Sequence, residues 1–211
     1  YYANLVMPGG AAQVQGLLRN FLAVQDSETG FIDWKPGLAG QRSRLLATPL
    51  LASLTWKYFQ ATADKAFLEE SFAGLLKFLQ TWFTPEHDHD GDGNPEWEQP
   101  RQFCFETHPV YDRWQTWSQG AEITTAESPA LNAFLTQEAR SLVQIAETVG
   151  RPDAIPWLKE TTEKLAAAVQ TTWEAETGSY HNRDRDTHHS TQGEVLAQKE
   201  GNSAIKFNKK F

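Results

Sequence analysis

Apolar residues recur at the spacing of an α-helix in five stretches of the chain, and this pattern constrains the fold more than any other feature of the sequence. The stretches cover approximately residues 10–25, 48–61, 65–83, 128–150 and 152–177. Local signals mark their ends: Thr48-Pro49 suits a first helical turn, and Gly150 favours a helix stop. Because short turns separate most neighbouring helices, consecutive helices are expected to lie antiparallel. The pattern predicts an all-α fold built from helical hairpins.

Size and charge narrow the class of protein. The chain has 211 residues with a formal net charge of −8, and 40% of its residues are hydrophobic, enough to bury a core. The acidic excess argues against a nucleic-acid partner, which needs clustered Lys and Arg. No apolar run approaches the roughly 20 residues that span a membrane. Cys104 is the single cysteine, which excludes a disulfide within the chain and is compatible with a cytoplasmic location.

The two ends of the sequence suggest a longer polypeptide. The chain begins with Tyr1 and has no signal-peptide pattern, and residues 204–211 alternate apolar and polar like the start of a strand. We therefore expect residues 1–186 to form part of a helical domain, and residues 187–211 to begin an inserted or following segment with a β-like tail. The charged run of residues 180–188 is interpreted as a solvated, self-paired turn between them.

A stretch without clear periodicity, residues 85–127, separates the third and fourth predicted helices. Irregular loops of this length are uncommon in compact domains and usually carry function. Four of the eight tryptophans of the chain lie in this stretch or at its edge: Trp82, Trp97, Trp114 and Trp117. Flat indole rings suit the apolar faces of sugar rings, so the chemistry of the protein is expected here.

The segment Asp88–Glu96, with the sequence DHDGDGNPE, follows the pattern of a calcium-binding loop. Alternating acidic residues direct oxygen atoms to one centre, and Gly93 permits the sharp turn. The glutamate usual at position 12 is replaced by Gln99, so a remote residue or water would have to complete the shell. Zinc is disfavoured, because no cysteine or further histidine joins His87 and His89 at ligand spacing. The predicted ligands of a structural Ca²⁺ are Asp88, Asp90, Asp92, Asn94 and Glu96.

Glu106 is the first candidate for a catalytic acid. It follows the apolar run Phe103-Cys104-Phe105, and apolar surroundings disfavour an ionised carboxylate. A carboxylic acid that stays protonated near neutral pH can protonate a departing glycosidic oxygen. Considered alone, however, an acidic residue in a loop is usually just solvated.

Three segments together resemble the clan of (α/α)6-barrel glycoside hydrolases that includes trehalase, mannosyl-oligosaccharide glucosidase and the mannosylglycerate hydrolases. They are residues 61–69, the acidic loop of residues 88–97, and Pro109-Val110-Tyr111-Asp112. The resemblance implies a partial (α/α)6 toroid and an inverting glycoside hydrolase acting on α-linked glucosides or mannosides. It places Glu106 on the general acid, where the clan has aspartate, and leaves Asp112 as the second candidate. The general base of the clan has no counterpart in this sequence, so we expect it outside these residues.

The resemblance also implies residues that line a sugar pocket. Some lie between the first two predicted helices and others follow the acid. The candidates are Trp34, Lys35, Arg42, Trp114, Trp117 and Gln119. The expected partner is a small carbohydrate or glycoside, with no nucleic acid and no membrane.

Two alternative functions remain open at the level of sequence. A non-catalytic carbohydrate-binding toroid is compatible with glutamate in place of aspartate at position 106. A polysaccharide lyase is less favoured, because such an enzyme holds an acidic polymer with basic residues, whereas the loop around Asp88 is acidic.

Overall fold

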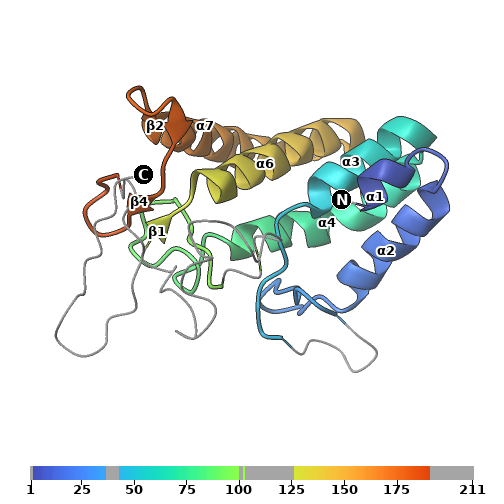
Figure 1. Ribbon diagram of the computed structural model, residues 1–211. Helices are drawn as coiled ribbons and strands as arrows, with labels where there is room; N and C mark the ends of the chain where they lie inside the picture. The colour runs from blue at the N-terminus through green and yellow to red at the C-terminus, as the bar shows by residue number, and fades with distance from the viewer. Residues whose placement is uncertain (1, 37–42, 100–101, 103–125, 191–211) are drawn as a thin grey trace. The chain divides into compact units, whose positions relative to one another are not determined.

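The computed structural model describes residues 2–36, 43–99, 102 and 126–190 (Figure 1). The chain divides into two compact units, Tyr1–Trp82 with Ala133–Ala166, and Phe83–Asn132 with Ala167–Phe211. The helices are α1 (Tyr2–Val6), α2 (Ala11–Ala23), α3 (Leu51–Thr62), α4 (Lys65–Thr81), α6 (Pro129–Val149), η3 (Pro152–Ala154) and α7 (Ile155–Thr171). The strands are β1 (Ala126–Glu127), β2 (Trp173–Glu174), β3 (Ser179–Tyr180) and β4 (Arg183–Asp184).

The first unit is helical, and its core confirms the predicted spacing. Every helix in it that the sequence predicted places apolar residues on a buried side. Fully buried side chains include Leu18, Phe67, Phe72, Leu75, Phe78, Leu79, Trp82, Leu135, Leu142, Leu158 and Leu165. Burying a large apolar side chain contributes roughly 1.5–3 kcal/mol, so this core is the main source of stability in the unit. The all-α prediction is therefore confirmed.

Local residues determine where the helical hairpin of α3 and α4 turns. Ala63 ends α3 in a left-handed conformation, with φ of 57°. Asp64 then caps α4, because its carboxylate accepts a hydrogen bond from the N–H of Phe67 at 3.1 Å. The same carboxylate accepts from the Tyr58 hydroxyl and the Gln15 amide, both at 3.0 Å. One aspartate thus joins α2, α3 and α4.

The second unit contains short antiparallel pairings. β1 pairs with β4, with Glu127 opposite Arg183, and β2 pairs with β3 in a hairpin. A single bridge also pairs Glu96 with Glu127. These pairings bring the acidic loop, β1 and the segment after β4 side by side, although they are far apart in the sequence.

The structure changes three details of the predicted fold. The last helix ends at Thr171, so the prediction of helix to just before Gly178 is wrong; the β2–β3 hairpin occupies those residues. The short helix α1 was not predicted. Trp82 and Trp97 are 0% and 1% exposed, so both belong to the core and cannot stack on a sugar. Among the described residues, no helix is both long and apolar enough to cross a membrane.

Candidate functional site

The acidic loop folds around the carboxylate of Asp88. Its two oxygens accept hydrogen bonds from the N–H groups of Gly91 and Gly93, each at 3.1 Å. Both glycines have positive φ, 74° and 89°, which side chains with a Cβ rarely adopt. Asp88 is buried, and burial raises its pKa above the ordinary value. Asp88 therefore holds the turn from inside, while Asp90 and Asp92 are exposed.

Glu96 closes the loop at its other end. One of its carboxylate oxygens accepts from the N–H of His89 at 3.2 Å and lies 2.9 Å from Nδ1 of the same histidine. Glu96 is fully buried, and burial raises its pKa although the bonds from His89 act in the opposite direction. Through its bridge to Glu127, this residue also joins the loop to β1.

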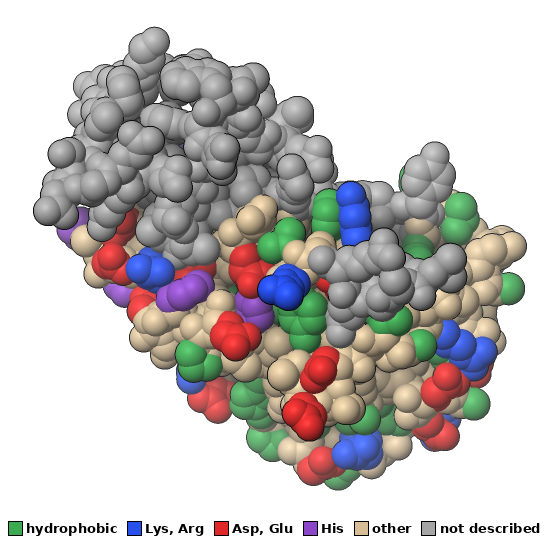
Figure 2. Space-filling model, turned by 90° about the horizontal axis from the view of Figure 1, so that it is seen from below, with side chains coloured by type: hydrophobic (Ala, Val, Ile, Leu, Met, Phe, Trp, Pro, Cys, Tyr) green, Lys and Arg blue, Asp and Glu red, His purple; other side chains and the backbone are tan. Residues whose placement is uncertain are grey.

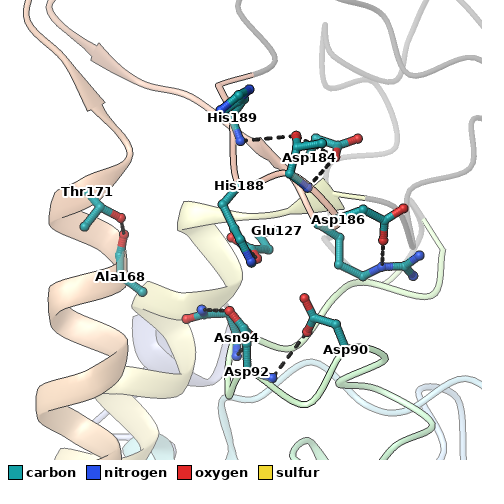
Figure 3. Close-up of polar contacts among 12 residues, drawn as sticks. Asp90, Asp92, Asn94, Glu127, Ala168, Thr171, Asp184, Asp186, His188 and His189 are labelled. Atoms are coloured by element: carbon teal, nitrogen blue, oxygen red, sulfur yellow. Dashed lines mark hydrogen bonds and ion pairs between the residues drawn. The ribbon is translucent and has the colours of Figure 1, made fainter.

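Four side chains from three segments converge next to this loop. One ligand atom from each of Asp90, Asp92, Glu127 and His188 lies within 4.8 Å of the others (Figure 3). Glu127 and His188 are in direct contact, with Oε1 and Nδ1 2.8 Å apart. We refer to these four residues as the acidic cluster. On the face shown in Figure 2, histidine side chains occur beside acidic and basic ones in one part of the surface.

The electrostatics of the acidic cluster are unusual at Glu127. Its side chain is 6% exposed, and burial raises its pKa to about 7, with the nearby charge of Asp92 adding to the effect. The contact with His188 lowers the pKa of Glu127 in part, and the Glu127 carboxylate in turn raises the pKa of His188. Three carboxylates at this separation repel one another, so a positive charge between them would be stabilised.

The structure brings together only part of the predicted calcium set. Asp90 and Asp92 belong to the acidic cluster, whereas Asp88 and Glu96 hold the loop itself. The fifth predicted ligand, Asn94, binds Asp92 through its backbone N–H at 2.7 Å and accepts a bond from Asn132 at 3.4 Å.

Sequence reasoning missed Glu127 and His188 as members of the site. The absence of a glutamate at position 12 of the loop did indicate a remote ligand, but nothing in the local sequence identified which residue it was. The charged run around residue 185 was expected to be a self-paired turn. Arg185 and Asp186 do pair at 2.9 Å, yet His188 from the same run contacts Glu127.

The residues of the acidic cluster fit a hard divalent cation by their chemistry. Asp90, Asp92 and Glu127 offer carboxylate oxygens, the donors that Ca²⁺ prefers. His188 offers a nitrogen, which suits Ca²⁺ poorly; its Nδ1 instead contacts the Glu127 carboxylate at 2.8 Å. Because one ligand comes from β1 and two come from the loop, a cation here would tie the two segments together.

The predicted sugar-binding residues are divided between described and undescribed parts of the chain. Trp34 and Lys35 lie in the first unit, where the Lys35 ammonium is 4.3 Å from the centre of the Trp34 ring. Trp34 is partly exposed, as a stacking residue must be. The other predicted catalytic and sugar-binding residues lie outside the described residues: Arg42, Glu106, Asp112, Trp114, Trp117 and Gln119.

The fold is similar to that of solved mannosylglycerate hydrolases. A GH63 mannosylglycerate hydrolase from Thermus thermophilus in complex with glucose matches with a TM-score of 0.67 and 13% identity, over 89% of this chain and 59% of that one. The same type of enzyme in complex with Tris and D-glycerate matches with a TM-score of 0.64 and 14% identity, over 81% of this chain and 56% of that one. The chain thus spans less than two thirds of either of these solved structures.

The sequence identifies the family within that class. Residues 9–204 match the model of the mannosylglycerate hydrolase MGH1-like glycoside hydrolase domain. The chain belongs to this family. No curated protein matches the sequence.

Proposed function

We propose that the protein is an inverting glycoside hydrolase that cleaves α-linked glucosides or mannosides by general acid/base catalysis. The observation that carries the proposal is the family match over residues 9–204. Glycosides of glycerate are the first substrates to try, because the similar solved structures are described as mannosylglycerate hydrolases and one holds D-glycerate.

Glu106 is the proposed general acid, with Asp112 as the second candidate. An inverting enzyme needs a second carboxylate roughly 6.5–9.5 Å from the acid, with room for the attacking water between them. That base is expected outside these residues. Trp34, Lys35, Arg42, Trp114, Trp117 and Gln119 are proposed to bind the sugar.

The test incubates the product of the complete gene with a panel of α-linked disaccharides and glycosylated glycerates. NMR then identifies the anomer of the sugar that is released. Initial release of the β-anomer from an α-glycoside supports inversion, and release of the α-anomer excludes it. Glu106→Gln should reduce kcat by a factor on the order of 10² to 10⁴, as expected for loss of a general acid. Glu86→Gln, the same change at an exposed glutamate, should leave kcat unchanged.

The same experiment discriminates a binding protein from an enzyme. Glutamate in place of the aspartate of the clan is the feature that favours a binder. If no substrate is cleaved while sugars still bind to both the unmodified protein and Glu106→Gln, the non-catalytic carbohydrate-binding function is supported instead. An unsaturated product that absorbs ultraviolet light would support a lyase.

Calcium is proposed as a structural ion bound by Asp90, Asp92 and Glu127. The proposal rests on the spacing of the loop and on the convergence of three carboxylates from two segments. When bound, the ion would brace the loop without contacting the substrate. The remaining loop residues of the prediction, Asp88, Asn94 and Glu96, would then shape the turn.

A further inference from the structure

Between α2 and α3, residues 32–34 and 45–47 form a short antiparallel neck. Asp33 and Leu46 are paired residues in this neck. The N–H of Trp34 donates to the carbonyl of Leu45 at 2.8 Å, and the N–H of Ala47 donates to the carbonyl of Ile32, also at 2.8 Å. Two strand-like pieces are therefore held together, and Trp34 lies in the first of them.

The carboxylate of Asp33 connects the two sides of this neck. Its Oδ1 accepts from the N–H of Lys35 at 2.7 Å and from the hydroxyl of Ser43 at 2.6 Å. Its Oδ2 accepts from the N–H groups of Ser43 at 2.7 Å and Arg44 at 3.0 Å. From described residues alone, each oxygen thus accepts two bonds, and the donors lie on both sides of the neck.

Burial and charge make this arrangement a strong one. Asp33 is 0% exposed, and burial alone would raise its pKa. The hydrogen bonds from Ser43, Lys35 and Arg44 outweigh that effect, so the pKa is lowered from its ordinary value and the carboxylate stays charged. Charged acceptors form the stronger hydrogen bonds. Arg44 has φ of 57°, an unfavourable conformation for a residue with a Cβ, and its bond to Asp33 helps to hold it.

The position of Trp34 depends directly on these bonds. Its own N–H is bound to Leu45, and the N–H of the next residue, Lys35, is bound to Asp33. The backbone is therefore fixed on both sides of Trp34. The Lys35 ammonium lies over one face of the partly exposed ring, so a sugar would stack on the opposite face.

We propose that Asp33 is a positioning residue for carbohydrate binding, which acts by holding the Trp34 ring in place to stack on a sugar. This inference rests on the proposed function, because it takes the ligand to be a sugar. Asp33 does not touch the substrate, so it affects how tightly the sugar binds and not the chemical step. The ligand class is a pyranoside with an exposed apolar ring face.

The experiment measures KM and kcat of Asp33→Asn in the product of the complete gene, with the substrate that the NMR panel identifies. Asparagine keeps the shape but has one acceptor oxygen in place of two. KM should rise roughly tenfold while kcat changes less than about twofold. This pattern is expected when a variant loses binding energy that contributes equally to the bound substrate and to the transition state. Ser43→Ala, which removes one donor and leaves Asp33 intact, should raise KM in the same direction by a smaller factor.

A second measurement separates positioning from general destabilisation. Trp34→Ala should raise KM by a similar factor, and adding Asp33→Asn to it should raise KM no further, because the residue through which Asp33 acts is gone. Asp26→Asn is the matched control. Asp26 also organises a turn, accepting bonds from Glu28 and Thr29, but in an exposed position. It should leave KM unchanged.

Each outcome decides the inference. An unchanged KM in both Asp33→Asn and Ser43→Ala, or equal effects of Asp33→Asn with and without Trp34, overturns it while leaving the hydrolase proposal intact. If Asp33→Asn does not fold, Ser43→Ala and its combination with Trp34→Ala carry the same test. A protein that neither cleaves nor binds any sugar overturns both proposals. A protein that binds sugars without cleaving them is tested in the same way through Kd.

Discussion

Ala63 has a left-handed backbone conformation at the end of α3, with φ of 57°. Glycine adopts this conformation without the steric penalty of a Cβ, which is about 1–2 kcal/mol. Ala63→Gly should therefore raise the free energy of unfolding by about 0.5–1 kcal/mol, after the extra entropy of glycine in the unfolded chain is subtracted. Thermal unfolding should show a Tm higher by roughly 2–4 °C per kcal/mol.

The control for this prediction is Ala73→Gly in the middle of α4. Ala73 is exposed, so the same substitution there changes only helix propensity and should destabilise by about 1 kcal/mol. A lower Tm in both variants would contradict the left-handed geometry at Ala63.

Asp64 concentrates three hydrogen bonds in one carboxylate at the start of α4. Asp64→Ala should lower the free energy of unfolding by about 2 kcal/mol, because it removes a helix cap and leaves the Tyr58 hydroxyl without this acceptor. Tyr58→Phe removes only one of the bonds and should cost about 1 kcal/mol. Urea unfolding of both variants measures the difference; equal losses would show that the cap contributes nothing.

At the scale of the elements, α6 supports the beginning of α3 through Glu138. This carboxylate accepts from the N–H groups of Ala52 and Ser53, at 2.7 and 2.8 Å. The first N–H groups of a helix have no partner within the helix, and they carry partial positive charge. Glu138 is 2% exposed, so α3 and α6 are joined by a buried carboxylate at a helix start.

Glu138 also predicts a pH dependence of stability. Burial raises its pKa above the ordinary 4.5, and the bonds from Ser53 and Ala52 lower it only in part. The folded protein therefore holds this proton at pH values where the unfolded chain has lost it. The contribution of Glu138 to stability is complete below pH 4.5 and is lost as the pH rises through the folded pKa.

Glu138→Gln tests this directly, because glutamine does not titrate. The Tm difference between the unmodified protein and Glu138→Gln should shift against the unmodified protein as the pH rises above 4.5. Glu147→Gln, the same change at an exposed position of the same helix, is the matched control. A constant difference for Glu138→Gln would argue that its bonds to α3 keep the carboxylate charged throughout.

Element boundaries were predictable where local residues determine them. Ser128-Pro129 predicts the start of α6, which begins at Pro129, and Gly150 follows its last residue. The predicted end of α7 was wrong by several residues. The β2–β3 hairpin that replaces the last predicted turns depends on the contact of Trp173 with Tyr180 across the turn. The interaction of Glu138 with α3 joins residues 86 positions apart, and no periodicity indicates it.

At the scale of the whole molecule, the acidic cluster also depends on contacts between residues far apart in the sequence, which no local pattern indicates. The loop pattern identified Asp90 and Asp92 because their spacing is local. Glu127 joins them through its bridge to Glu96, and His188 through the pairing of β1 with β4. Two-residue strands carry too little pattern to be predicted, since their pairing depends on the rest of the fold.

The acidic cluster also connects the proposed cation to the proposed catalysis. The two candidates for the catalytic acid, Glu106 and Asp112, lie in the sequence between Glu96 and Glu127. Glu96 and Glu127 are paired with each other in a bridge. An ion held by Asp90, Asp92 and Glu127 would hold the two ends of this stretch of chain together. Its removal is therefore expected to affect catalysis before it affects the helical core.

Calcium removal tests this last consequence. Chelation with EGTA should lower kcat of the complete gene product and speed hydrogen exchange in residues 88–96 and 126–127, while exchange in α3 and α4 stays unchanged. Added Ca²⁺ should reverse both effects, and added Mg²⁺ should not, since it retains its water ligands and demands a stricter geometry. Asp90→Asn with Asp92→Asn should mimic chelation, whereas Asp153→Asn, at an exposed site in the helical unit, should not. Unchanged exchange in the loop after chelation would leave the acidic cluster without a role in binding Ca²⁺.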